Sequence, residues 1–376
     1  LKDYFEQESR HNHDWYFRII DEQTAGDLDF DEVFQWVDRT ISKPGQQWLY
    51  KKLRCIEENQ DSLKKIDEQA EFFIAHEKVR LQCQYHLHNV SDEDAYHLQQ
   101  LLFDEPPAKP SWYPLLPVLS FLSLAFLLLM FIDGKFIYGF LPVLITNVVL
   151  HYRNKNRLFG YLNALPQLGK AKKAADALSR IEGIQNHFRG YEYQKGIAKI
   201  SSKLSFISII EGQGSELAAA GWYFVEMIKM LFNLEMIFFY QFAENLSRYR
   251  QSLVQLFHFI AHIDGAISLA SFRAGLSQYC KPEFKNRKSI KFEEMVHPLI
   301  PDCVPNSLHL SDRSLLLTGS NMSGKTTFIR SVGLNALLAQ TLNTCMAQKW
   351  QSPFLKIYSS IRLTDDIMEA ESYYLK

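Results

Sequence analysis

The sequence predicts a mostly α-helical protein that contains a membrane-spanning helical hairpin and continues into the first part of an α/β domain. Residues 1–105 and 156–275 alternate charged and apolar residues at helical spacing, with few prolines and glycines. Between these helical regions lie two neighbouring uncharged runs. A glycine-rich segment near residue 320 follows an apolar stretch and precedes a helical pattern. We therefore expect four segments: a helical region at 1–105, the hairpin at 106–157, a second helical region at 158–276, and the α/β region at 277–376.

The charge balance excludes recruitment of nucleic acid by overall charge, and the cysteine spacing argues against a zinc site. The chain of 376 residues has a net charge of −1, so any contact with nucleic acid must come from a local basic patch. The five cysteines lack the spacing of a zinc site, and we expect reduced thiols in a cytosolic compartment. They are Cys55, Cys83, Cys280, Cys303 and Cys345. Because the chain begins with Leu1 and stops inside the expected α/β domain, we expect a piece of a longer protein.

The hairpin is predicted from charge. Residues 112–132 and 136–152 carry no charged side chain, and a short turn at 133–135 separates them. Each run can cross a hydrocarbon core of about 30 Å, the second one barely. Positive charges lie outside the pair, which predicts that both ends face the cytoplasm; they are Lys109, Arg153, Lys155 and Arg157. The location expected is the inner, cytoplasmic membrane, with the other regions on the cytoplasmic side. The alternative is a hairpin buried in a large helical core.

A third apolar stretch, Trp222 to Phe242, is predicted to be an amphipathic helix in a soluble core. Glu226, Lys229 and Glu235 interrupt it. A charge at a bilayer centre costs about 2.5–3.5 kcal/mol even on the lenient insertion scale.

The segment Gly319-Ser-Asn-Met-Ser-Gly324-Lys325-Thr326 fits the phosphate-binding pattern Gly-x4-Gly-Lys-[Ser/Thr]. We expect a short buried strand at Ser314–Thr318 before it and a helix at Phe328–Gln340 after it. In such a loop, backbone amides and the helix N-terminus face the phosphates, the lysine reaches the β- and γ-phosphates, and the threonine hydroxyl binds Mg²⁺. The sequence therefore predicts a site for a nucleoside triphosphate, formed by Gly319, Ser320, Asn321, Met322, Ser323, Gly324, Lys325, Thr326 and Thr327.

The residues within this loop narrow the class. Thr318–Arg330, with Asn321-Met322 before the second glycine, resembles the P-loop of the MutS mismatch-repair ATPases. The resemblance covers roughly residues 27–60 and 255–376. Other segments that carry it are Val33–Thr40, Tyr279–Phe284, Val296–Pro298, and Thr364–Ile367 with the following Ser372-Tyr-Tyr.

The resemblance implies an ATPase that couples ATP binding and hydrolysis to DNA engagement and works as a dimer, with ATP and Mg²⁺ as cofactors. It places Thr326 on the Mg²⁺ and Ser372 near the partner subunit's nucleotide. It also places Phe284 against the adenine, although an ordinary core phenylalanine is the alternative. Asp365 and Asp366 belong by resemblance to the Ser372 loop. The family's second acidic strand and downstream histidine do not occur before Lys376, so the catalytic residues stay unassigned and hydrolysis is expected only of the intact protein.

Two departures from the family shape the functional hypothesis. Soluble MutS proteins lack the hairpin, and nothing before residue 27 resembles their mismatch-reading domain. The leading hypothesis is a membrane-anchored MutS-type ATPase that binds DNA. The alternative is a nucleotide-gated membrane scaffold that dimerises and recruits protein partners without binding DNA.

A basic cluster near residue 285 is either a DNA-backbone patch or a solvated loop; it contains Lys281, Lys285, Arg287, Lys288 and Lys291. His297-Pro298 is expected to shape a turn.

Overall fold

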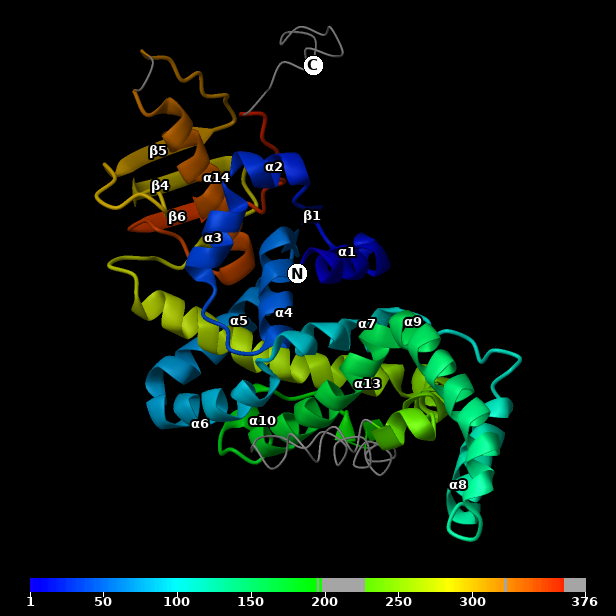
Figure 1. Cartoon of the computed structure of the whole chain (residues 1–376). Helices are drawn as coiled ribbons and strands as arrows, with labels where there is room; N and C mark the ends of the chain where they lie inside the picture. The colour runs from blue at the N-terminus through cyan, green and yellow to red at the C-terminus, as the bar shows by residue number, and fades with distance from the viewer. Residues whose placement is uncertain (195, 198–226, 321–322, 362–376) are drawn as a thin grey trace, which may run out of the picture. The chain divides into compact units, whose positions relative to one another are not determined.

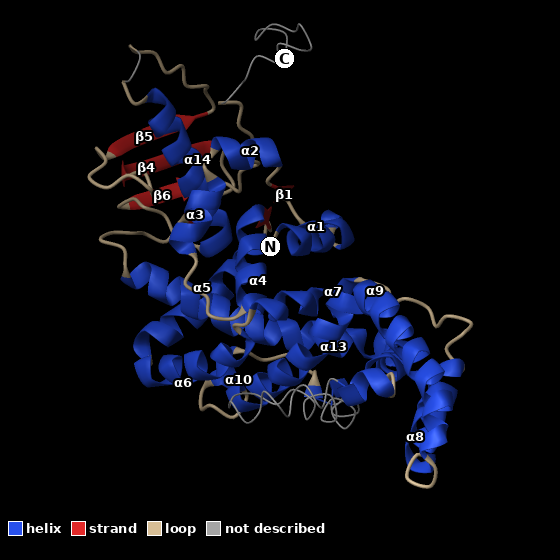
Figure 2. Cartoon of the chain, in the orientation of Figure 1, coloured by secondary structure: helices blue, strands red, loops and turns tan. Residues whose placement is uncertain are grey.

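The computed structural model describes residues 1–194, 196–197, 227–320 and 323–361 (Figure 1). These residues are mostly helical with a few strands (Figure 2), as the sequence predicts. Contacts group the chain into two compact units. The first unit comprises Leu1–Ile41, Gly45–Gln84 and Ala261–Lys376, and the second comprises Ser42–Pro44 and Tyr85–Ile260. The first unit thus joins the beginning of the chain to its last part, which the sequence placed in separate segments.

The first unit contains helices from both ends of the chain. They are α1 (Lys2–His11), α2 (Glu22–Asp27), α3 (Phe30–Val37), most of α4 (Lys43–Arg54), α5 (Gln60–Ala75), most of α6 (Glu77–Leu87) and α14 (Lys325–Leu342). Its strands are β1 (Arg18–Ile19), β2 (Cys55–Ile56), β3 (Glu283–Phe284), β4 (Ser289–Met295), β5 (Asn306–Ser311) and β6 (Lys349–Ser352).

Local sequence accounts for the first helices. The Asn59 side chain accepts hydrogen bonds from the backbone N–H groups of Asp61 and Ser62, at 3.0 and 3.1 Å, and so caps the start of α5. The same helix buries Leu63, Ile66 and Phe73 at helical spacing. The prediction of helix is confirmed here, apart from the short antiparallel pair β1–β2, which the helical pattern does not reveal.

Four of the strands form one sheet in the order β3-β6-β4-β5. Strand β3 is parallel to β6, whereas β4 is antiparallel to both β5 and β6. The buried rings of Phe292 and Trp350 stack at 5.4 Å between centroids on neighbouring strands. Helix α14 buries Leu334, Leu337 and Leu338 and contacts α5.

The predicted strand at Ser314–Thr318 is wrong for this structure. The segment has no regular secondary structure, and Leu316 is 86% exposed. A buried strand needs hydrogen-bonding neighbours, and none of the strands among the described residues pairs with this segment. The predicted helix after the loop is confirmed, and it extends slightly beyond both expected ends, to Lys325 and Leu342.

The second unit holds the predicted hairpin. Its helices are α7 (Leu98–Phe103), α8 (Leu115–Leu129), α9 (Ile137–Leu178), α10 (Ile184–His187) and most of α13 (Leu234–Ala274). Helix α8 contacts α9 across a turn in which the Asp133 carboxylate accepts the Lys135 N–H at 2.9 Å (Figure 1). Helix α8 has 15 residues, so the first helix is shorter than the uncharged run that predicts it.

The third apolar stretch is not one continuous helix where it is described. Turn residues precede α13, and Asn233 adopts a left-handed conformation with φ 50°. Two of the interrupting charges, Lys229 and Glu235, form an ion pair at 3.2 Å. Helix α13 is apolar and long enough to cross a membrane, but its most apolar window is 78% buried within the protein. Within the predicted stretch Met236, Phe239 and Phe242 are buried, which agrees with a core position for this part, whereas residues 222–226 lie outside the described residues.

Candidate nucleotide-binding site

The glycine-rich loop turns directly into the first residues of α14. Gly324 precedes the helix with φ 82°, a left-handed conformation that side chains other than glycine adopt at a cost. Gly319 lies so close to the end of the loop that an added Cβ would stand 2.8 Å from the Ser323 Oγ. Both glycines therefore allow backbone geometry that a larger residue would disturb. Asn321 and Met322, which the sequence assigns to the same site, lie outside the described residues.

The Lys325 ammonium group is held by oxygen atoms of this loop. Its Nζ donates to the Gly319 carbonyl oxygen at 2.9 Å, to the Ser323 Oγ at 3.2 Å and to the Ser320 carbonyl oxygen. The lysine thus folds back across the loop that precedes it. This arrangement places one positive charge at the helix start, where the helix dipole also favours an anion.

The first turn of α14 is accessible to solvent at Thr326, the predicted Mg²⁺ ligand. Thr326 is exposed, whereas Thr327 is half-buried and its carbonyl oxygen accepts a hydrogen bond from the Ser331 Oγ at 2.7 Å. The Thr326 hydroxyl is therefore accessible to a ligand. With 18 residues, α14 is long enough to have a full helix dipole behind this turn.

Phe284, the predicted adenine-stacking residue, already has an aromatic partner. Its ring stacks on Phe354 with centroids 4.3 Å apart and planes inclined by 9°. Phe354 also contacts Phe17 edge-on. The sequence did not reveal this cluster, because its members come from three distant segments. The adenine contact stays a prediction. An adenine would have to stack on the face of the Phe284 ring opposite Phe354.

Comparisons with known proteins match the region that contains the loop. The family described as MutS domain V matches residues 315–376. The DNA mismatch repair protein MutS of Fervidobacterium nodosum is 30% identical over 227 residues, which are 58% of this chain and 24% of that protein. The proteins of the same name from Staphylococcus haemolyticus and Petrotoga mobilis are 30% and 36% identical over 152 and 139 residues. These alignments cover 38% and 35% of this chain and 17% of each relative.

Residues 315–376 match the MutS family, and the chain is similar to MutS proteins over the ranges given above. It spans about a quarter or less of the length of these relatives. The matched part includes the glycine-rich loop and α14, where the geometry above is found. Ser372, Asp365 and Asp366 also fall within the matched range but outside the described residues, so their assigned roles stay predictions.

Other residues that the sequence singles out have structural partners. The His297 Nδ1 accepts the Leu299 N–H at 3.1 Å, which fits the expected role in a turn. Burial, followed by the nearby Arg330 guanidinium, lowers the pKa of His297, so its ring is neutral near pH 7. Arg330 in turn pairs with Asp29 at 2.7 Å and joins α14 to the start of α3.

The basic cluster after residue 280 is largely neutralised by neighbouring carboxylates. Lys285 pairs with Glu283 at 3.1 Å, and Lys291 pairs with Glu293 at 2.8 Å. Lys281 contacts two carboxylates of α5, described below. Exposed pairs of this kind contribute little to stability. The arrangement favours the solvated-loop interpretation over a continuous DNA-backbone patch.

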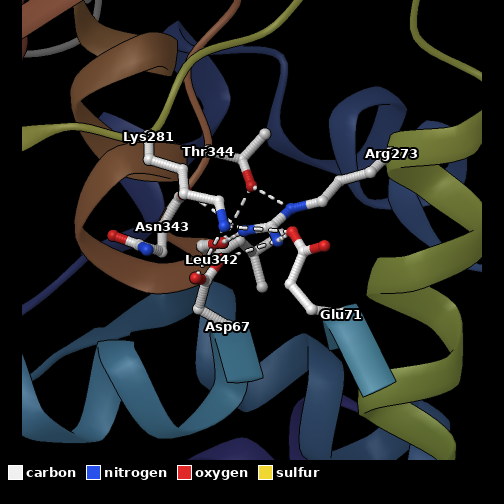
Figure 3. Close-up of polar contacts among 7 residues, drawn as sticks. All are labelled: Asp67, Glu71, Arg273, Lys281, Leu342, Asn343 and Thr344. Carbon is white, nitrogen blue, oxygen red and sulfur yellow. Dashed lines mark hydrogen bonds and ion pairs between the residues drawn. The ribbon is translucent and has the colours of Figure 1, made fainter. Parts of the chain in front are cut away.

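A buried arginine fixes the far end of α14, and no pattern in the sequence predicted it. The Arg273 side chain is fully buried, and Figure 3 shows it surrounded by residues of α5 and of the turn after α14. Its Nη1 lies 2.7 Å from the Asp67 Oδ1, its Nε donates to the Thr344 Oγ1 at 3.0 Å, and its Nη2 donates to the carbonyl oxygens of Leu342 and Asn343 at 3.2 and 3.1 Å.

Two acidic residues one helical turn apart complete this cluster. Lys281 places its Nζ 2.9 Å from the Asp67 Oδ2 and 3.0 Å from the Glu71 Oε1 (Figure 3). Although burial alone would raise it, hydrogen bonds from Lys281 and Arg273 lower the pKa of Asp67. The spacing of Asp67 and Glu71 on one face of a predicted helix was the signal available in the sequence. Nothing local in the sequence identified Arg273 as their partner.

We expect Arg273→Ala to lower the free energy of unfolding by about 3–5 kcal/mol, because it removes the buried partner of the Asp67 Oδ1 and the donor to the last carbonyl oxygens of α14. Chemical denaturation followed by circular dichroism measures this loss. Arg10→Ala is the matched control, since Arg10 forms an exposed pair with Glu6 within one helix. The control should cost less than about 1 kcal/mol. Equal losses in the two variants would show that the buried cluster does not stabilise the fold.

Proposed function

We propose that the intact protein is a membrane-tethered MutS-type ATPase that binds MgATP at the loop before α14 and couples it to DNA engagement. Members of the MutS family are ATPases, and the relatives named above are DNA mismatch repair proteins. The observation that carries the proposal is the position of the Lys325 ammonium group at the start of α14, within a loop that follows the family pattern. Dimerisation is part of the proposal and rests on the resemblance around Ser372.

The residues at the loop fit a nucleoside triphosphate with its metal ion. Lys325 would exchange its bonds to loop carbonyl oxygens for stronger charge-assisted bonds to the β- and γ-phosphates. The amides of Ser320–Gly324 would donate to the phosphates, and Thr326 offers an accessible hydroxyl to Mg²⁺. The bound metal would neutralise charge that develops on the phosphates. Phe284 would contact the adenine.

Membrane tethering is supported by the exposed apolar side chains of the α8–α9 pair. Its outer surface is apolar: Phe121, Ile132 and Tyr138 are 69%, 80% and 81% exposed. The candidate span Gly134–Asn154 is only 11% buried within the protein. A water-soluble helical pair would bury such side chains, whereas lipid accepts them.

Polar side chains of the same pair point inward and are bonded there. The Asn147 Nδ2 donates to the Ser123 Oγ at 2.9 Å and to the Leu231 carbonyl oxygen at 2.7 Å. The Asn233 Nδ2 donates to the Asn147 Oδ1 at 2.8 Å. All of these residues belong to the second unit. Asn147 thus joins α9 to Ser123 of α8 and to the turn before α13, and polar groups that bond to one another among apolar helices are the arrangement that a hydrocarbon environment favours. The proposal keeps both hairpin ends, and therefore the remaining regions, on the cytoplasmic side.

The nucleotide site is tested by Lys325→Ala in protein made from the complete coding sequence. Loss of the charge-assisted bonds, worth about 1.5–3 kcal/mol, should weaken ATP binding about ten- to a hundredfold in an equilibrium titration. Lys78→Ala, at an exposed position of α6, should leave the affinity unchanged. If both variants bind ATP like the parent protein, the assignment of the loop is wrong.

The tether is tested by flotation with vesicles of phosphatidylcholine and phosphatidylglycerol. The parent protein should float with the lipid and resist extraction by alkaline carbonate. Phe121→Lys combined with Ile145→Lys should reduce the floating fraction, since each charge costs about 2.5–3.5 kcal/mol near the bilayer centre. Leu81→Lys is the control, because Leu81 is equally apolar and 55% exposed but lies in α6. A parent protein that stays in the aqueous fraction without detergent would contradict the tether.

DNA engagement separates the proposal from the scaffold alternative. Fluorescence anisotropy with duplex DNA should give a dissociation constant that rises steeply with salt, as expected when lysines and arginines displace counterions from phosphates. ATP should change this affinity in the parent protein but not in Lys325→Ala. Absence of DNA binding at low salt, together with retained ATP binding, would favour the scaffold that recruits protein partners.

A further inference from the structure

Cys280 and Cys345 lie opposite each other although they are far apart in the sequence. They form an antiparallel bridge in which the Cys280 N–H donates to the Cys345 carbonyl oxygen at 2.8 Å and the Cys345 N–H donates back at 2.9 Å. A reciprocally bonded antiparallel pair has its Cα atoms about 5.5 Å apart. This value falls within the range of about 4.4–6.8 Å that a disulfide requires. Both residues are free thiols in the structure.

The two thiols differ in reactivity. The Cys345 side chain is fully buried, whereas Cys280 is partly accessible. Hydrogen bonding with the Cys345 thiol lowers the pKa of Cys280, and burial raises the pKa of Cys345 well above its usual value. Because the thiolate is the reactive form, Cys280 is the thiol that we expect an oxidant to attack first, with Cys345 as the neighbour placed to close a bond.

We propose that Cys280 and Cys345 are a redox-sensitive dithiol that a hydroperoxide converts into a reversible disulfide. In the first step the Cys280 thiolate attacks one peroxide oxygen. An S–O bond forms, the O–O bond breaks, and the leaving hydroxide takes up a proton to become water. In the second step the Cys345 sulfur attacks the Cys280 sulfenic acid, the S–O bond breaks, and hydroxide leaves with the thiol proton as a second water. The two thiols lose two electrons in total, and the peroxide gains them.

The disulfide would act on the turn that ends α14. Cys345 directly follows Thr344, and Cys280 lies between Tyr279 and Lys281, whose side chains contact the buried Arg273 or its acidic partners. Figure 3 shows Lys281, Asn343 and Thr344 around the Arg273 guanidinium. The bond would therefore fasten the segment before β3 to the end of the helix that begins at the glycine-rich loop. It needs no bound nucleotide, so it stands independently of the proposed ATPase activity.

The remaining cysteines provide internal controls. Burial raises the pKa of Cys55 and Cys83 to about 12, which leaves little thiolate at neutral pH. Cys303 is half-buried in the connection between β4 and β5, and its Sγ lies 3.6 Å from the Val304 carbonyl oxygen. Cys303→Ala is thus the matched control for an accessible thiol outside the bridge.

The test treats the chain with hydrogen peroxide, blocks the remaining thiols with N-ethylmaleimide and maps peptides without reduction. We expect a cross-linked peptide pair containing Cys280 and Cys345, which dithiothreitol releases. Cys303→Ala should give the same cross-link. In Cys345→Ala the cross-link should be absent, and dimedone should label Cys280 as a sulfenic acid. Circular dichroism checks that both variants fold. If Cys345→Ala does not fold, the peptide map of the parent protein still tests the proposal.

Three outcomes of the parent map would overturn the proposal. In the first, Cys280 stays reduced while Cys303 is oxidised. In the second, Cys280 is oxidised to a sulfinic acid without any cross-link to Cys345. In the third, Cys280 pairs with a cysteine other than Cys345 in the folded protein.

Discussion

The packing of the first unit depends on the ion pair and hydrogen bonds that the buried Arg273 guanidinium makes. This guanidinium lies at the end of α13 and bonds at once to the acidic face of α5 and to the last carbonyl groups of α14. Ions buried in this way are stable only when every donor finds a partner, so the three helices hold one another in a single register. The glycine-rich loop lies at the opposite end of α14. Its position is therefore set by contacts remote from the nucleotide that it is proposed to bind.

The same helix α14 has a second anchor near its start. Arg330 pairs with Asp29, and burial next to this pair keeps His297 neutral. The helix is thus fixed on one side by α3 and at its end by α5 and α13, while its first turn stays accessible. A fixed helix whose N-terminal turn is accessible suits anion binding, because the backbone N–H donors of that turn need no rearrangement before a ligand arrives.

Much of this arrangement was predictable, for identifiable reasons. Helical periodicity identified the helices of the first 105 residues, and the glycine-rich pattern located the start of α14, because both signals are local. The predicted strand at Ser314–Thr318 failed because a run of leucines predicts burial but not the neighbours that would provide it. The cluster of Arg273 and the pairing of Cys280 with Cys345 join residues far apart in the chain. No local pattern encodes such contacts, so they became visible only in the structure.

The discontinuous first unit has a consequence for the order of synthesis. Residues up to Gln84 leave the ribosome well before Ala261 and the residues after it, with which they share a core. During that interval the α8–α9 segment emerges, and the early helices still lack α14 and the end of α13. Because domains fold as units while the chain lengthens, the unit around α14 closes last. Until then the apolar faces of the early helices that the completed unit buries stay exposed, which favours aggregation of incomplete chains.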